Sequence, residues 1–99
     1  MDAIETRVAD LNPLEDEAHS KPRPVLEQLS DQELLQAARN PKDGKHLVRN
    51  TRTGNLVDGN GRAHELLRRV KDPNSSIGPD TLVPVEDYSP DVSMFPDLD

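Results

Sequence analysis

The chain has 99 residues, of which 19 are acidic, 12 are basic and none is cysteine, so its net charge is -7 and a disulfide framework or a cysteine-based zinc site is excluded. No apolar run approaches the ~20 residues of a membrane span, and no secretory signal is visible, which favours a cytoplasmic protein without membrane contact. Aromatic residues make up 2% of the chain, so we expect one small domain with a thin core.

The sequence divides into three parts. Residues 1–24 are expected to form an acidic N-terminal tail, because prolines and acidic residues interrupt any regular pattern there. A short, weakly held helix is predicted over residues 3–11, where apolar side chains recur at helical spacing: Ile4, Val8 and Leu11. The domain itself is expected over residues 25–88, and residues 89–99 form a second acidic tail.

The first clear element is a helix that begins after Ser30. Ser30 and Glu33 have the spacing of a capping box, in which each side chain accepts a hydrogen bond from the other residue's backbone amide. Leu29 and Leu34 flank this box at the positions of a hydrophobic staple. The step Asn40–Pro41 ends the helix, because a residue that precedes proline avoids helical geometry.

Three short strands follow. His46–Thr51 and Leu56–Val57 are predicted to form a hairpin, with Gly54 supplying a positive φ in the turn between them. Thr81–Glu86 is the third strand. Pro84 lies inside it and has no N–H to donate, which predicts an edge position in the sheet.

Between the hairpin and the last strand lies a glycine-rich turn, followed by a helix from about Arg62 to Lys71. The helix has apolar residues at helical spacing: Ala63, Leu66, Leu67 and Val70. Gly59 and Gly61 permit close approach of a ligand to the backbone, and the helix start presents unpaired amides to an anion. We therefore expect a phosphate site made by Asp58, Gly59, Asn60, Gly61 and Arg62. The alternative is that the glycines only permit a turn, with Asn60 as the helix cap.

Charge is distributed in blocks. Residues 39–71 hold nine basic and three acidic side chains, a net charge of +6. Residues 1–38 carry a net charge of -6, and residues 72–99 carry -7. The basic middle can attract a phosphate, whereas the acidic chain as a whole predicts weak or no binding to duplex DNA. The acidic flanks either keep the protein soluble or fold over the basic segment.

The element order resembles the ParB/sulfiredoxin-like superfamily. Its members carry a Gly-x-x-Arg motif after an apolar strand, and here this motif is Gly59–Arg62 after Leu56–Asp58. The last strand, with Leu82–Val85, resembles the short apolar strand that contains a proline in that family. The resemblance covers about residues 26–88. It implies a small α+β domain with a short mixed sheet, two main helices, and disordered or loosely packed termini.

The resemblance further implies that the turn at Gly59–Arg62 handles a phosphate or a nucleotide. The sequence does not identify a cofactor, and a nucleotide with Mg²⁺ is one candidate. In some relatives the region supports nuclease or phosphotransfer chemistry. Three departures from the family are informative. The chain has no cysteine, which excludes sulfinic acid reduction. It lacks the second arginine that ParB proteins have beside the motif, and it is too short to include their DNA-reading domain.

Glu65 and His64 are the candidate catalytic residues on the helix after the turn. Glu65 or Asp58 could act as a base or a Mg²⁺ ligand, and His64 could protonate a phosphodiester. The alternative for Glu65 is an ion-pair row with Arg62 and Arg69, which lie three residues before it and four after it. The alternative for His64 is a solvated helix residue. No spacing among the three histidines resembles a zinc site.

Lys45, Arg49 and Arg52 are expected to extend the basic surface if the hairpin packs beside the turn. The middle of the chain has no aromatic residue, which argues against base stacking but not against phosphate contacts. The tail at residues 93–99 gathers apolar and acidic side chains and is either a docking motif for a protein partner or a lid on the domain.

Two functions follow from these patterns. The first is a ParB-like domain that binds phosphate or nucleotide, in one version as a nuclease or a toxin-type effector. The second is a non-catalytic protein-interaction module that keeps the fold without activity.

Overall fold

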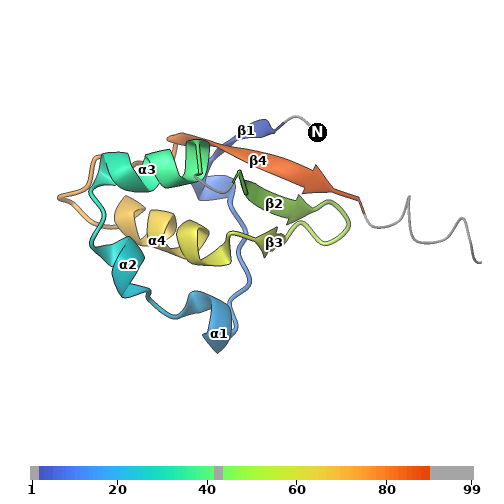
Figure 1. Ribbon diagram of the computed structural model, residues 1–99, viewed down its shortest axis with the longest axis horizontal. Coiled ribbons are helices and arrows are strands. Elements are labelled where there is room, and N and C mark those ends of the chain that lie inside the picture. The colour runs from blue at the N-terminus through green and yellow to red at the C-terminus, as the bar shows by residue number, and fades with distance from the viewer. Residues whose placement is uncertain (1–2, 42–43, 90–99) are drawn as a thin grey trace, which may run out of the picture.

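The computed structural model describes residues 3–41 and 44–89, which form a four-stranded mixed sheet covered by helices (Figure 1). The strands are β1 (Ile4–Arg7), β2 (Leu47–Asn50), β3 (Leu56–Asp58) and β4 (Leu82–Tyr88), in the spatial order β1-β4-β2-β3. β4 pairs antiparallel with β1 and parallel with β2, and β2 and β3 form the predicted antiparallel hairpin. The small α+β fold that the sequence predicted is therefore confirmed.

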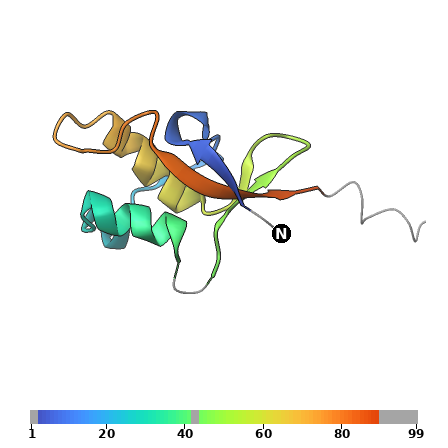
Figure 2. The same ribbon diagram turned by 90° about the horizontal axis from the view of Figure 1, so that it is seen from above.

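The two longer helices are α3 (Asp31–Arg39) and α4 (Asn60–Val70). Shorter turns of helix precede them: η1 (Val8–Asp10), α1 (Glu17–Ser20) and α2 (Pro24–Glu27). Figure 2 shows α3 and α4 side by side, on the same side of the ribbon of β4. Their apolar stripes face the sheet, which buries them.

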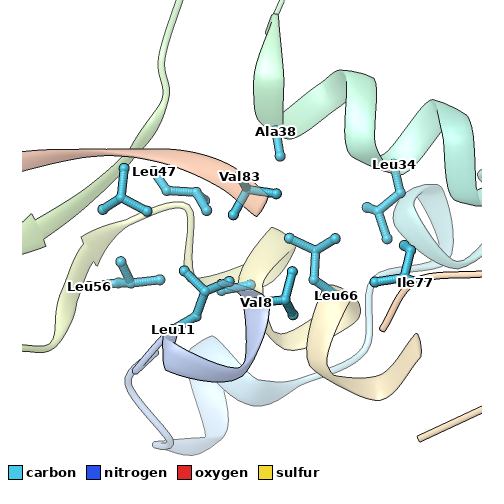
Figure 3. Close-up of a cluster of buried hydrophobic side chains, with 11 residues drawn as sticks. Val8, Leu11, Leu34, Ala38, Leu47, Leu56, Leu66, Ile77 and Val83 are labelled. Atoms are coloured by element: carbon cyan, nitrogen blue, oxygen red, sulfur yellow. The ribbon is translucent and has the colours of Figure 1, made fainter. Parts of the chain in front are cut away.

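The core lies between this helical layer and one face of the sheet. Side chains from β2, β3, β4, η1, α3 and α4 point toward one another there (Figure 3). The buried hydrophobic residues are Val8, Leu11, Leu34, Ala38, Leu47, Leu56, Ala63, Leu66, Ile77, Val83 and Val85. None of them is aromatic, so the core is as thin as the composition predicted.

The capping box of α3 is present as predicted. The Oγ of Ser30 accepts a hydrogen bond from the amide of Glu33 at 3.1 Å, and Oε1 of Glu33 accepts one from the amide of Ser30 at 2.8 Å. These hydrogen bonds, above all the one from the Ser30 amide, hold the pKa of Glu33 below its ordinary value. The helix ends at Arg39, directly before Asn40.

The prediction for residues 3–11 was wrong. Residues 4–7 form strand β1 instead of a helix, and only the short η1 follows. The spacing of Ile4, Val8 and Leu11 does not require a helix. Val8 and Leu11 are both buried, because the chain reaches the core at each of these two positions. Pairing of β1 with β4 outweighs the weak helical preference of so short a segment. The segment assigned to a tail therefore supplies a strand and two core side chains.

The expected edge position of the last strand was also wrong, since β4 lies between β1 and β2. Pro84 is tolerated in this inner strand because of where it falls. It pairs with Glu5 on β1, but the parallel ladder with β2 begins only at Val85, which pairs with Leu47. The missing N–H of the proline therefore lies one residue before that ladder starts.

Candidate functional site

The turn between β3 and α4 requires glycine at Gly59. Its φ is 81°, in the left-handed region, and a Cβ at this position would collide with the side chain of Leu47. Gly59 is the residue before α4, which begins at Asn60, two residues earlier than the sequence predicted. A helix thus opens directly at the end of the strand, as the sequence analysis expected for a phosphate site.

The side chains around the turn bond to the protein's own backbone. Asn60 is buried, and its Oδ1 accepts a hydrogen bond from the amide of Leu14 at 2.7 Å. Its Nδ2 donates to the carbonyl of Leu56 at 3.4 Å. Asp58 accepts from the amide of Gly59 at 2.8 Å. Neither residue caps α4, so the side chain of Asn60 ties the N-terminal segment to the turn instead.

Among the residues that the structure describes, no side chain caps the first turn of α4. The first amides of a helix have no partner within the helix, and they carry the positive end of its dipole. In α4 these are the amides of Asn60, Gly61 and Arg62, because the next amide, that of Ala63, already donates to Gly59. The start of α4 therefore remains available to an anion.

Arg23 lies against this helix start, a placement that the sequence analysis missed. A Cβ on Gly61 would approach the Nε of Arg23 to 2.8 Å, so the absence of a side chain at Gly61 lets Arg23 lie there. Across residues 3–41 and 44–89, the guanidinium of Arg23 has no ion pair or side-chain hydrogen bond. The signal in the sequence was the position of Arg23 between two prolines, Pro22 and Pro24. Pro24 lies in the first turn of α2, and its fixed φ sets the direction in which the chain enters that helix.

Arg62, which was expected to bind the anion, also makes a hydrogen bond to another helix of the protein. Its Nη1 donates to the carbonyl of Ala37 at 2.9 Å, in the last turn of α3. A cation at this place satisfies a carbonyl at the negative end of that helix. Arg62 still lines the site, but one side of its guanidinium is already bound.

An open cleft of about 610 Å³ lies in front of α4. Its lining residues come from α2 and from the turn between β3 and α4: Arg23, Pro24, Val25, Leu26, Val57, Asp58, Gly59, Asn60, Gly61 and Arg62. All five residues predicted to form the phosphate site therefore line one cleft, together with Arg23.

A second, more apolar groove of about 860 Å³ lies between α2 and α3. Its lining residues are Val25, Leu26, Leu29, Glu33, Gln36, Ala37, Asn40, Pro41 and Arg62. The groove and the cleft share Val25, Leu26 and Arg62, so they form one continuous surface.

Glu65 lies outside both hollows, in the buried half of α4. Its side chain is 7% exposed, and both of its oxygens accept hydrogen bonds from arginines. Oε1 accepts from Arg68 at 2.9 Å, and Oε2 accepts from Arg69 at 3.0 Å. The pair with Arg69 is part of the predicted ion-pair row, whereas Arg62 turns toward α3. A catalytic role for Glu65 stays a prediction, and its contacts with the two arginines are structural.

Arg69 extends this network to the connection between α2 and α3. Its Nη1 bonds to Asp31 at 2.8 Å, and its Nη2 donates to the carbonyl of Leu29 at 2.7 Å. Asp31 also accepts hydrogen bonds from the amide of Ser76 and from the hydroxyl of Ser75. The bond from the Ser76 amide, followed by those from Arg69 and Ser75, holds the pKa of Asp31 far below its ordinary value.

The remaining predicted residues are not brought to the cleft. His64 bonds through Nε2 to the carbonyl of Leu14 at 2.7 Å, so it donates from that nitrogen, and it does not line the cleft. Arg49 pairs with Asp87 at 2.8 Å across β2 and β4. Lys45 and Arg52 are exposed, and neither lines the cleft. The predicted catalytic pair and the predicted basic surface thus lie apart from the cleft that the five predicted phosphate-binding residues line.

Comparison with known proteins finds no relative from which a function could be transferred to this site. In the described part of the chain, no group of three or more histidine, aspartate or glutamate side chains is arranged to hold a metal ion. Across residues 3–41 and 44–89, every helix is too short or too polar to cross a bilayer. No family model matches the chain, and neither a curated protein nor a solved structure matches it.

Proposed function

We propose that this chain is a ParB-like domain that binds a phosphate-bearing ligand, such as a nucleotide, in the cleft at the start of α4. One observation carries the proposal: the uncapped first turn of α4 faces a cleft in which the guanidinium of Arg23 has no partner in residues 3–41 and 44–89. The order of α3, β2, β3, α4 and β4 around Gly59–Arg62 supports the resemblance on which the prediction was based.

Each part of the cleft has a role in this proposal. The amides of Gly61 and Arg62 donate to phosphate oxygens, and Arg23 balances the phosphate charge. Gly61 has no side chain to keep the phosphate away from the backbone. Asp58 lines the same cleft and would repel a bare phosphate, but it supplies an oxygen ligand when Mg²⁺ accompanies a nucleotide.

The proposal concerns binding rather than turnover. Asp58 is the one carboxylate among the residues that line the cleft. In a nuclease or toxin-type version of the function, Asp58 would therefore be the base or the Mg²⁺ ligand, in preference to Glu65 or His64.

The test is an NMR titration of the ¹⁵N-labelled chain with phosphate, CTP and ATP, each with and without Mg²⁺. We expect the amides of Gly59, Gly61 and Arg62 to shift and saturate. Arg23→Ala should weaken binding by about tenfold, the effect of losing one charge-assisted contact of about 1.4 kcal/mol. Lys21→Ala removes the same charge two residues away, outside the cleft lining, and should leave binding unchanged.

Two results would reject the proposal. One is a titration in which the amides of the turn do not move with any of the three ligands. The other is binding that Arg23→Ala and Lys21→Ala weaken equally, since this would indicate attraction to net charge rather than a site.

The alternative function, a non-catalytic interaction module, is favoured by a different observation. The groove between α2 and α3 is lined largely by apolar side chains, and Val25 at its margin is 74% exposed. Exposed apolar surface with a polar rim is typical of an interaction site.

A further inference from the structure

The groove between α2 and α3 combines an apolar floor with positive charge at one end. Val25, Leu26, Leu29, Ala37 and Pro41 supply the apolar surface. Glu33 at the rim is held in the capping box by the amide of Ser30. The groove therefore suits a side chain of hydrophobic or aromatic type.

The positive charge lies where the groove meets the cleft. Arg62 lines both hollows, and Arg23 and the first amides of α4 lie just beyond it. A ligand that fills both hollows thus needs an apolar side chain and, a few residues away, a carboxylate. An acidic peptide with a hydrophobic anchor has this chemistry.

The chain contains such a peptide at residues 90–99, which lie outside the described residues. Met94, Phe95 and Leu98 lie there among three aspartates, and residues 72–99 include neither lysine nor arginine. In an extended segment, Phe95 and Asp97 are about 7 Å apart, a spacing that lets one enter the groove while the other approaches Arg23.

The fold indicates which copy of the chain supplies this segment. β4 ends at Tyr88, at the end of the molecule away from α2 and α3 (Figure 1). Phe95 lies seven residues after Tyr88, so it can reach at most about 25 Å from the end of β4. We propose that residues 90–99 of a second copy dock in the groove between α2 and α3, with Phe95 as the anchor and an aspartate at Arg23.

This inference rests in part on the proposed function, because the aspartate would occupy the phosphate site. Docking of the segment and binding of phosphate should therefore compete. A protein that binds its ligand would release the second copy, and self-association would report on the occupancy of the cleft.

The test uses the whole chain of 99 residues. ¹⁵N-labelled protein is diluted about fiftyfold from millimolar concentration while the amides of Val25, Leu26, Ala37 and Gly61 are followed. We expect these amides to shift together with a single apparent dissociation constant. Added phosphate should move them toward their dilute positions.

Matched variants identify the two surfaces. Val25→Asn and Phe95→Ala should each reduce the concentration-dependent shifts at least fivefold. Leu82→Asn changes another exposed aliphatic residue, 42% exposed and outside both hollows, and should have no such effect. Ser93→Ala is the control within the tail. Val25 and Leu82 are both exposed and lie outside the buried core, so Val25→Asn and Leu82→Asn should fold.

Three outcomes would overturn the inference. The amides of α2 and α3 could stay in place on dilution. They could respond equally in all four variants. Phe95→Ala could shift these amides by the same amount at every concentration, which would mean that residues 90–99 bind to the groove of the same molecule. If phosphate shifts Gly61 while dilution moves nothing, the inference fails and the proposed function stands. If neither has an effect, both fail.

Discussion

The two ends of α4 use their charges in opposite ways. At the C-terminal end, Glu65, Arg68 and Arg69 are joined by ion pairs, and Arg69 also holds Asp31. At the N-terminal end, the first amides have no side-chain cap, and the nearby Arg23 has no ion pair in residues 3–41 and 44–89. The same helix therefore has one end that the fold has satisfied and one end that can take a ligand.

The difference has a physical cause. The last turns of α4 lie against the connection between α2 and α3, where backbone carbonyls need donors, and Arg69 supplies them. The first turn follows Gly59, which has no side chain with which to accept a hydrogen bond from the first amides. Charge counted along the sequence does not distinguish these cases. Most arginines of the segment with net charge +6 bond to other parts of the fold, and the cation beside the start of α4, Arg23, lies outside that segment.

The largest effect is expected from a substitution in the ion-pair network at the C-terminal end of α4. Arg69→Ala removes the more buried of the two arginines that pair with Glu65, together with the ion pair to Asp31, and should lower the free energy of unfolding by about 3–5 kcal/mol. Arg68→Ala is the control, because its side chain is 37% exposed and such a pair contributes at most about 1 kcal/mol. Urea denaturation followed by circular dichroism measures both. Equal losses in the two variants would mean that burial of the network contributes nothing.

The next largest effect is expected at Gly59, the residue directly before the N-terminal end of α4. Gly59→Ala forces alanine into the left-handed region, at about 1–2 kcal/mol, and drives its Cβ into Leu47, at about 1–3 kcal/mol more. Gly54→Ala incurs only the first cost, because its φ is also positive at 80° and nothing lies within 4 Å of its Cβ. Thermal unfolding compares the two. If both variants lose the same stability, the contact between Gly59 and Leu47 is unimportant.

Low pH should weaken the network at the C-terminal end of α4, because Asp31 in that network becomes protonated. The pKa of Asp31 is lowered in the folded protein from its ordinary value of 3.8, so its contribution to stability is complete above that value. This contribution is lost as the pH falls below about 4, through the lowered pKa of the folded state. Asp31→Asn should therefore be less stable at neutral pH and should lose less on acidification.

Urea midpoints between about pH 6 and pH 2 measure this effect in both proteins. Asp80→Asn is the control, because Asp80 is 84% exposed and pairs only at the surface with Arg7. Parallel curves for the natural chain and Asp31→Asn would show that Asp31 does not couple stability to pH.

Local signals in the sequence predicted most of the fold. The capping box at Ser30 located α3, glycine and strand patterns located the hairpin, and apolar spacing located α4. The failures came from long-range pairing. Nothing local shows that residues 4–7 pair with β4, or that Pro84 falls one residue before a parallel ladder.

The residues that line the cleft were predicted to the same extent and for the same reason. The turn at Gly59–Arg62 is a local motif, and all of its residues line the cleft. Arg23 is more than 30 positions away in the sequence, and only the packing of α2 against α4 brings it there. The roles of Arg62 and Arg69 likewise depend on carbonyls of other elements, which spacing within one helix cannot reveal.

The smallest effect on stability, and the sharpest test of the open end, is expected from Gly61→Ala. Alanine within a helix stabilises it by up to about 1 kcal/mol relative to glycine. Its Cβ would come within 2.8 Å of the Nε of Arg23, whose long side chain can move aside at little cost. The variant should therefore be slightly more stable than the natural chain, yet it should bind phosphate more weakly because Arg23 no longer lies over the amides. Combining it with Arg23→Ala separates the two causes: if displacement of Arg23 explains the weaker binding, the double variant should bind no more weakly than Arg23→Ala alone, whereas a further loss would mean that the methyl group itself blocks the approach of the anion to the backbone.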